Sequence, residues 1–439
     1  MRADPEANLG RTEEILDLVR DVSDSSEALG TYLQENTVSI SKTGITKVHS
    51  ATEDLLSLRI FRNGRIGIAG TASGDLETLA ELAMASSKFG RPATFDLPSS
   101  LQPSSVELVD PELAPIGPED LLDRLRAFRQ DVRDVFPHGS MDGSLSLHRR
   151  SFRLANSEGL DADYEKMFVE WNLRVSVPTG EGTVSIATTG SSGSWQEALP
   201  DPDRILPPSE WLALAPPHHP PGGTPVVLSP EAFSVLLQGF RAGVSGSSLV
   251  RGYSPLAGSV GRAIFSDLLT VNDRPLLNYG AASAPFDAEG TATRDKALVD
   301  RGRFTGFIFD LATASEAGEA STGNAGRNYN DLPEPVCTNL LVETGEHTPE
   351  EMLSAAGDCV LVDQILSGGT SNVLSGDFSL DASLSYVCRR GTVEGRAGRL
   401  RVTGNVYRAL SRISMVGRKR HLVGQDSLPY VAVEGLDVF

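Results

Sequence analysis

Residues 229–249 read SPEAFSVLLQGFRAGVSGSSL, and their pattern predicts an amphipathic helix. Ser229 suits the N-cap, and Pro230 suits the first helical position because its missing N–H has no helical partner there. Apolar side chains recur at the helical spacing and predict one buried face, made of Phe233, Leu236, Leu237, Phe240 and Val244. Gly243 and Gly246 loosen the pattern and predict its end. No side chain on this helix binds a metal or takes up a proton readily.

The sequence on either side of this helix is rich in strands and turns. TPVVLS (224–229) reads as a strand that leads into the helix, and the chain alternates between apolar and polar residues through most of the stretch after Leu268. Shorter helices are predicted at 311–318 and 407–414, and a third begins at Thr348, which suits its N-cap.

The N-terminal half combines alternating strands with three predicted helices, at 12–22, 75–89 and 118–135. Asn63-Gly64 between two apolar runs predicts a hairpin. We therefore expect an α+β protein: an N-terminal strand-rich sheet with packed helices, followed by a C-terminal β-rich domain with a few helices.

The segment 207–225 holds seven prolines and predicts the domain boundary. We expect an N-terminal domain at 1–215, with 1–92 and 118–206 as alternative subdomains, and a C-terminal domain at 222–439. His218-His219 falls in the boundary, but adjacent residues of an extended segment point to opposite sides and no third ligand is near, which favours a loop over a metal pair.

Composition excludes several functional classes. The formal net charge of −19 argues against a nucleic-acid partner, and the basic cluster at 418–421 reads as a solvated helix end. No apolar run approaches the roughly 18–20 residues of a membrane helix. Three cysteines without a CxxC motif favour reduced thiols, so we expect a soluble cytoplasmic protein.

Motifs of self-sufficient catalysis are missing from the sequence. It has no GxxxxGK[ST] loop, no GxSxG motif and no HExxH motif, and Cys359 lies among apolar residues as an inert thiol would. No residue is therefore predicted to be catalytic or to bind a metal.

Four segments together resemble the TldD/PmbA family, the so-called modulators of DNA gyrase that are regarded as peptidase components. They are FDAEGTATRDKALVDRGRFTGFIFD (286–310), STGNAGRNYNDLPEPVCTNLLVETGEHTPEEML (321–353), SGDFSLDASLSY (375–386) and ISMVG (413–417). NSEG (156–159) and the domain order match the N-terminal half more loosely. The resemblance covers essentially the whole chain.

The resemblance implies a place in one of the two branches of the family, which are thought to pair as a heterodimer. TldD-like members carry HExxxH on the first helix of the C-terminal domain, where two histidines and a later Cys hold zinc. Here Gln238 and Gly243 stand at the histidine positions and Gly239 at the glutamate position, and 417–439 has no Cys. The chain thus resembles the PmbA (TldE) branch, with no cofactor of its own and zinc expected on a TldD-like partner.

The same resemblance implies that FDAEG and STGNAGR shape a cavity or the subunit contact. Asp287, Glu289, Asn324 and Arg327 are the candidates for that role, although Asp and Asn in tight turns more often satisfy backbone donors. Two segments depart from the family pattern: SLSYVCRRG, and VEGRAGRLRV, which lacks the usual proline. These departures favour a specialised paralogue over an orthodox cellular partner.

Three functional hypotheses follow. The first is the non-metal subunit of a heterodimeric metallopeptidase that acts on unfolded peptides. The second is a stand-alone protein that binds a peptide or precursor, and the third is a metal-free biosynthetic enzyme with Asp287 and Glu289 as its acid/base pair. Substrate, pathway and the choice between a heterodimer and a homodimer are not readable from the residues.

Overall fold

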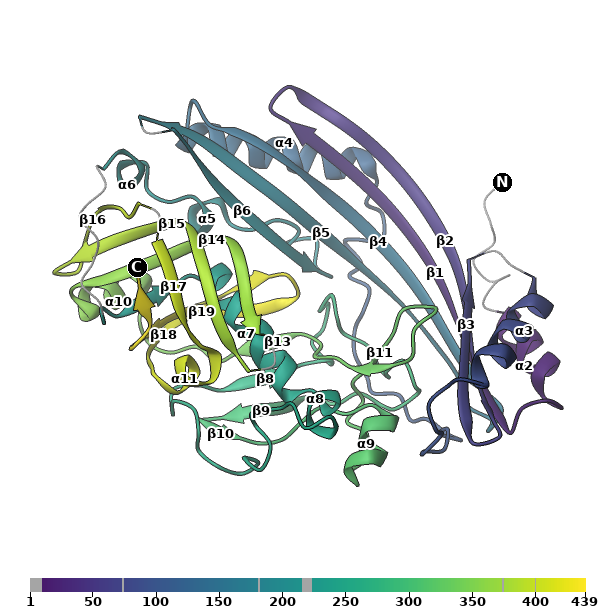
Figure 1. The fold of residues 1–439 in the computed structure, drawn as a ribbon. Helices are drawn as coiled ribbons and strands as arrows, with labels where there is room; N and C mark the ends of the chain where they lie inside the picture. Colours follow the sequence, from purple (N-terminus) through teal and green to yellow (C-terminus); the bar gives the residue numbers. More distant parts are fainter. Residues whose placement is uncertain (1–9, 73–74, 181, 215–222, 373–374, 399) are drawn as a thin grey trace.

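The computed structural model describes residues 10–72, 75–180, 182–214, 223–372, 375–398 and 400–439. Its N-terminal half is a six-stranded antiparallel sheet in the order β3-β2-β1-β4-β5-β6, which Figure 1 shows as a long curved layer. The strands are β1 (Ser25–Ser41), β2 (Gly44–Arg62), β3 (Arg65–Thr71), β4 (Ser140–Asn156), β5 (Asp161–Thr179) and β6 (Gly182–Ser192).

The pairing of β1 joins the two halves of this sheet. β1 pairs with β2 on one side and with β4 on the other, so the segments 1–92 and 118–206 contribute to one sheet rather than two. Asn63 and Gly64, both at positive φ, form the turn between β2 and β3, which confirms the predicted hairpin.

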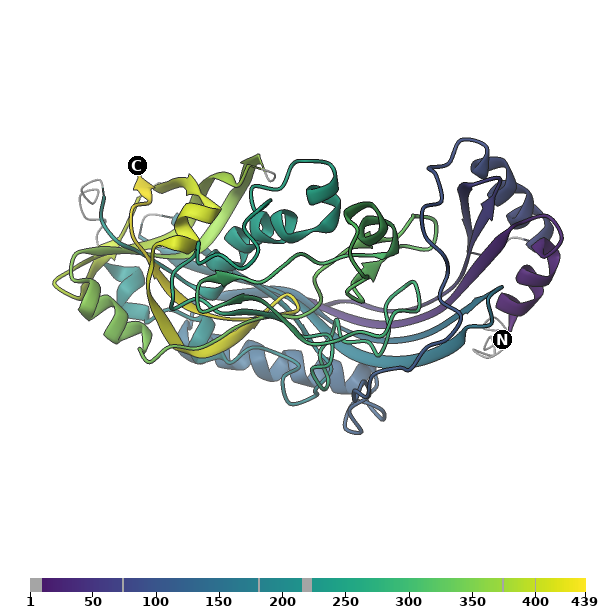
Figure 2. The same ribbon diagram turned by 90° about the horizontal axis from the view of Figure 1, so that it is seen from below.

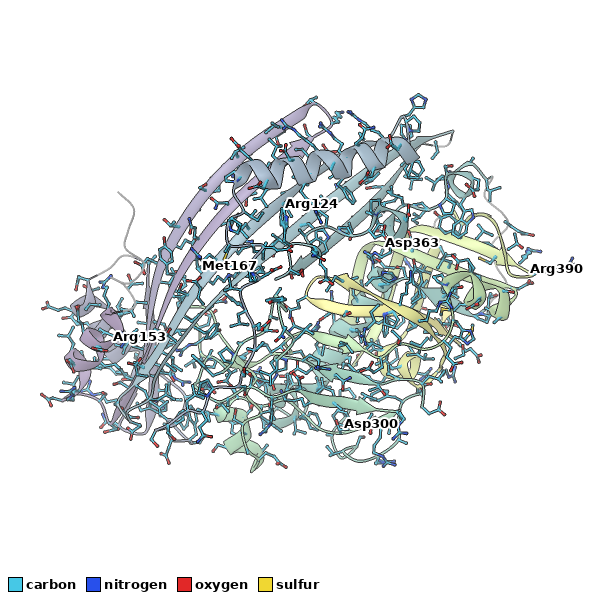
Figure 3. The ribbon with its side chains drawn as sticks, turned by 180° about the vertical axis from the view of Figure 1, so that it is seen from behind. Arg124, Arg153, Met167, Asp300, Asp363 and Arg390 are labelled. Carbon is cyan, nitrogen blue, oxygen red and sulfur yellow. The ribbon has the colours of Figure 1, made fainter. Side chains whose placement is uncertain are left out.

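Helices cover one face of the sheet, and loops of the C-terminal half pack on the other. α4 (Pro118–Val135) packs its buried side chains on odd-numbered residues of β4 and β5, such as Leu147 and Met167. Arg124 of α4 and Met167 are labelled in Figure 3. α2 (Arg11–Val19) and α3 (Leu76–Ser87) pack on the same face at the far end of the sheet, where Arg153 lies in Figure 3.

The C-terminal half contains a twelve-stranded mixed sheet, in which β7 pairs with β14, and β13 with β19, in parallel. Figure 2 shows these elements within the concave side of the N-terminal sheet. The strands are β7 (Val226–Leu228), β8 (Val271–Asp273), β9 (Lys296–Asp300), β10 (Arg303–Phe304), β13 (Leu340–Val342), β14 (Cys359–Asn372), β15 (Asp377–Arg389), β16 (Thr392–Arg396), β17 (Leu400–Asn405), β18 (Ile413–Val423), β19 (Asp426–Val433) and β20 (Asp437–Val438).

Short elements complete the fold. β11 (Ala325–Gly326) and β12 (Glu334–Pro335) form a separate two-stranded ladder. Thr348 caps its helix with a reciprocal capping box, as the sequence predicted. The helices are α5 (Pro202–Ile205), α6 (Ser209–Ala213), α7 (Pro230–Val244), α8 (Gly246–Val250), α9 (Leu311–Ala317), α10 (Pro349–Ala356) and α11 (Val406–Ser411).

The predicted α+β class is confirmed, with one local correction. The basic cluster at 418–421 lies within strand β18 and not at a helix end, because its pairing with β19 overrides the helix-like apolar run before it. Pro207–Leu214 of the predicted boundary carries α6, whereas His218-His219 lies outside the described residues. Within the described ranges, no helix is both long enough and apolar enough to cross a membrane.

Candidate functional site

The helix that the sequence singled out is α7, and its apolar face is buried as predicted. Ser229 caps it by accepting a hydrogen bond from the Ala232 N–H at 3.1 Å. Phe233, Leu236 and Phe240 are at most 1% exposed, and the helix packs on β14, β19 and β7. Its last residue is Val244, after which Ser245 is extended and the separate helix α8 begins.

The three positions of the zinc motif differ in their surroundings. Gln238 is exposed, whereas Gly239 and Gly243 are buried. A Cβ added at Gly243 would clash with the hydroxyl of Tyr407 and lie 3.0 Å from its Cζ. The same hydroxyl donates a hydrogen bond to the carbonyl of Gly239 at 3.1 Å. Tyr407, from the start of α11, therefore fills the space into which a side chain at 243 would extend.

These residues do not fit a zinc ion. Neither an imidazole nor a carboxylate stands at the three positions, and zinc in proteins is held by Cys, His, Asp or Glu. Across the part of the chain that the structure describes, no group of three or more such side chains is placed to hold a metal ion.

Asp287 ties the FDAEG loop to the STGNAGR loop. Its Oδ1 accepts hydrogen bonds from the N–H groups of Glu289 and Thr291, and its Oδ2 accepts one from the N–H of Ala325 at 2.9 Å. Burial, together with the negative charge of Glu289, raises the pKa of Asp287 to about 7. Because both oxygens are engaged by backbone donors, the geometry favours a structural role for this carboxyl.

Glu289 belongs to a buried cluster of alternating charges that links the loops to the N-terminal sheet. Arg59 of β2 donates from Nη1 to Glu289 Oε1 at 2.5 Å and from Nη2 to Glu27 Oε2 at 3.0 Å. Arg327 Nη1 lies 2.8 Å from Glu27 Oε1, and all four side chains are 0% exposed. Glu289 Oε2 also accepts the Leu311 N–H at the start of α9. We call these four residues the buried charge cluster.

In the buried charge cluster, burial disfavours the charged forms of the side chains, whereas the ion pairs favour them. Burial raises the pKa of Glu289, and the guanidinium of Arg59 opposes that shift. Two arginines face two glutamates, so the cluster carries no net charge when all four are ionised. Removing one member would leave an uncompensated charge in the interior.

Asn324 is held in a second polar network. Its amide donates to Asp273 Oδ2 at 2.7 Å and to the carbonyl of Val336 at 2.9 Å, while its oxygen accepts from Lys296. Every hydrogen-bonding direction of the amide group is thus used to hold the STGNAGR loop against β8.

A cavity of about 460 Å³ lies between the N-terminal sheet and these loops. We call it the sheet–loop cavity. Asp287, Asn324 and Arg327 line it, whereas Glu289 is not among its lining residues. The sheet contributes even-numbered residues of β4 and β5, which share the face turned away from α4: Arg150, Phe152, Tyr164, Lys166, Phe168 and Glu170.

Aromatic rings and cations alternate along that wall. Phe152 and Tyr164 stack with ring centroids 4.9 Å apart, and the guanidinium of Arg150 lies 4.9 Å from the ring centroid of Phe168. Lys166 donates to the carbonyl of Ala281 at 2.9 Å. Burial, reinforced by the charge of Arg150, lowers the pKa of Lys166 to about 7.

Sequence reasoning found the loop residues and missed their partners in the sheet. Arg59 and Glu27 are separated from Glu289 and Arg327 by more than 200 positions, so local patterns cannot pair them. A weak signal did exist: Arg59 stands inside the apolar strand run LLSLRIF, where a fully buried arginine requires an acidic partner. Arg150 and Lys166 carried no comparable signal, because alternation predicts only that they share a face.

Fold and site together define an α+β protein in which positions 238, 239 and 243 of the helix that opens the C-terminal half carry no metal ligand. Residues 221–439 match the model of the PmbA/TldA metallopeptidase C-terminal domain. The chain belongs to the TldD/PmbA family.

The relatives match less than half of the chain, whereas a solved structure matches nearly all of it. An uncharacterized protein of Methanocaldococcus jannaschii is 31% identical over 38% of this chain and 40% of its own length. A metalloprotease PmbA homolog of Haemophilus influenzae is 28% identical over 44% of this chain and 40% of its own length. The chain therefore aligns with about two fifths of these relatives. TldE from Thermococcus kodakarensis shares the fold, with a TM-score of 0.87 at 22% identity, over 97% of this chain and 99% of that one.

Proposed function

We propose that the chain is the non-metal subunit of a TldD/TldE-type heterodimeric metallopeptidase that acts on unfolded peptides. In this proposal the zinc and the hydrolytic step belong to a TldD-like partner, and this chain contributes part of the chamber that holds the peptide. The observation that carries the proposal is the packing of Gly243 against Tyr407, which leaves no room for a ligand at a position of the zinc motif.

Two further observations support this role. The fold of the chain is that of TldE over nearly its whole length, which places the two proteins in the same architectural class. The loops that carry FDAEG and STGNAGR are fixed to the sheet by fully buried ion pairs, so the sheet–loop cavity is held open by a rigid frame.

The stand-alone binding protein is the second candidate. The sheet–loop cavity supports it, because the N-terminal sheet and the two loops enclose a space of about 460 Å³ within this chain. The metal-free enzyme is less favoured, since the carboxylate oxygens of Asp287 and Glu289 all accept hydrogen bonds within the protein. A general acid or base must instead reach the reacting group of its substrate.

Co-expression with a TldD-like chain that carries HExxxH tests the proposal. We expect a complex of one copy of each chain by light scattering, and hydrolysis of an unstructured peptide only when both are present. The matched control is a partner whose motif glutamate is replaced by glutamine, which should keep the complex and abolish hydrolysis. Two chains that remain separate while this one binds the peptide would favour the stand-alone candidate.

A further inference from the structure

The sheet–loop cavity is lined by cationic side chains, two of which carry N–H donors that no described residue accepts from. Arg150 stacks on Phe168, but its guanidinium makes no hydrogen bond or ion pair with any residue in the described ranges. An arginine normally offers five N–H donors to acceptors. Its position on the cavity wall leaves these donors available to a bound molecule.

Arg327 faces the cavity from the opposite, loop side. Its side chain is 0% exposed and is paired with Glu27 through Nη1, yet Nε and Nη2 have no hydrogen-bond partner among the described residues. Leaving donors of a buried cation unsatisfied costs free energy, which an acceptor entering the cavity would recover.

The carboxylates that line the cavity are fewer than its cations. Three cations line it, Arg150, Lys166 and Arg327, against the two carboxyl groups of Glu170 and Asp287. Asp287 is already committed to three backbone N–H groups. Glu27 neutralises Arg327, so an anion is favoured here through the unfilled N–H donors of Arg150 and Arg327 and not through an excess of positive charge. The Phe152–Tyr164 stack offers an apolar surface beside these donors.

We propose that the sheet–loop cavity binds the carboxylate of a peptide, with Arg150, Lys166 and Arg327 as its receptors. Arginine and carboxylate form strong charge-assisted hydrogen bonds, and the neighbouring rings pack apolar parts of the peptide chain. The cavity volume of about 460 Å³ lies within the range of small-ligand sites and admits only a short segment. The inference names the substrate class for the proposed function and rests on it.

Three labelled, unstructured peptides test the proposal on the isolated chain by fluorescence anisotropy. The first has a free C-terminal carboxylate and no acidic residue, the second is amidated with one internal glutamate, and the third is amidated and neutral. We expect the first or second to bind at least about tenfold more tightly than the third, as a charged hydrogen bond predicts. Preference for the first assigns the terminal carboxylate, and preference for the second assigns an acidic side chain.

Arg150→Gln should remove most of that preference, and Arg149→Gln is its matched control. Arg149 is the neighbouring residue of β4 on the opposite face, where it pairs with Glu165 at 3.0 Å. Thermal melts establish that both variants fold. Equal binding of all three peptides, no binding of any, or wild-type behaviour of Arg150→Gln would overturn the proposal.

A separate measurement distinguishes failure of this inference from failure of the proposed function. Because Arg150 lies on the wall of the sheet–loop cavity, we expect the Arg150→Gln variant to assemble with a TldD-like chain and to differ from wild type only in peptide binding. Assembly without carboxylate preference rejects the inference alone, whereas carboxylate preference without assembly rejects the subunit role.

Discussion

Replacing Glu289 by glutamine probes the buried charge cluster with the least change in shape. The substitution keeps an oxygen that can accept the Leu311 N–H at 2.7 Å, but it removes the charge that faces Arg59. Two arginines would then share the single carboxylate of Glu27, leaving one uncompensated positive charge among side chains that are 0% exposed.

The expected cost follows from that burial. Breaking a buried ion pair by removing one partner costs about 3–5 kcal/mol, because the remaining charge stays desolvated. Glu165→Gln is the matched control: its carboxylate pairs with Arg149 at 3.0 Å, but the two side chains are 42% and 43% exposed. Such a surface pair contributes about 0–1 kcal/mol.

Urea denaturation measures the effect of the substitution on the stability of the whole protein, and hydrogen exchange measures its effect on individual segments. We expect the Glu289→Gln midpoint to fall well below those of wild type and Glu165→Gln. We also expect faster amide exchange at 286–293 and at the start of α9, where the cluster holds the chain. Equal midpoints for the two variants, with unchanged exchange in these segments, would refute the view that the cluster fixes the loops to the sheet.

Three other predictions concern α7, acid stability and the sheet–loop cavity. Gly243→Ala should destabilise the protein by about 1–3 kcal/mol through overpacking against Tyr407, and adding Tyr407→Phe should recover part of the loss in a thermal double-mutant cycle. Burial, reinforced by the charge of Arg150, lowers the pKa of His148 to about 4. Between pH 4 and 6.5 the unfolded chain therefore binds a proton that the folded chain does not bind. The free energy of unfolding should fall as the pH drops through that window, and less so in His148→Gln, as melts at several pH values will show. Carboxylate affinity should fall as the pH rises through 7, because Lys166 loses its proton there while Asp287, whose pKa is also raised to about 7, gains negative charge. Anisotropy titrations should show a flatter profile in Lys166→Met, because Asp287 is then left as the group whose charge changes near pH 7.

The elements that local chemistry dictates could be predicted from the sequence. The apolar face of α7, the Ser229 and Thr348 caps and the Asn63-Gly64 hairpin depend on residues a few positions apart, and the structure confirms each of them. The cluster at 418–421 was assigned wrongly because its state depends on a partner strand, which local spacing does not reveal.

The candidate site was predictable only in part for the same reason. Asp287, Asn324 and Arg327 were identified through the family motifs, and the structure brings them to one cavity. Their partners on β1, β2, β4 and β5 reach the loops only after the sheet has folded, as the 230-residue separation of Arg59 and Glu289 illustrates. The sequence shows only that the zinc-motif positions on α7 lack metal ligands, whereas the structure shows that Tyr407 occupies the space beside Gly243.

Metal content and peptidase activity of the isolated chain test the subunit role most directly. The chain is purified alone, supplied with zinc, dialysed, analysed by mass spectrometry and assayed on an unstructured peptide before and after a TldD-like chain is added. The account predicts no stoichiometric zinc and no hydrolysis by the chain alone, with hydrolysis appearing only in the mixture. Stoichiometric zinc together with peptide cleavage by the isolated chain would contradict it.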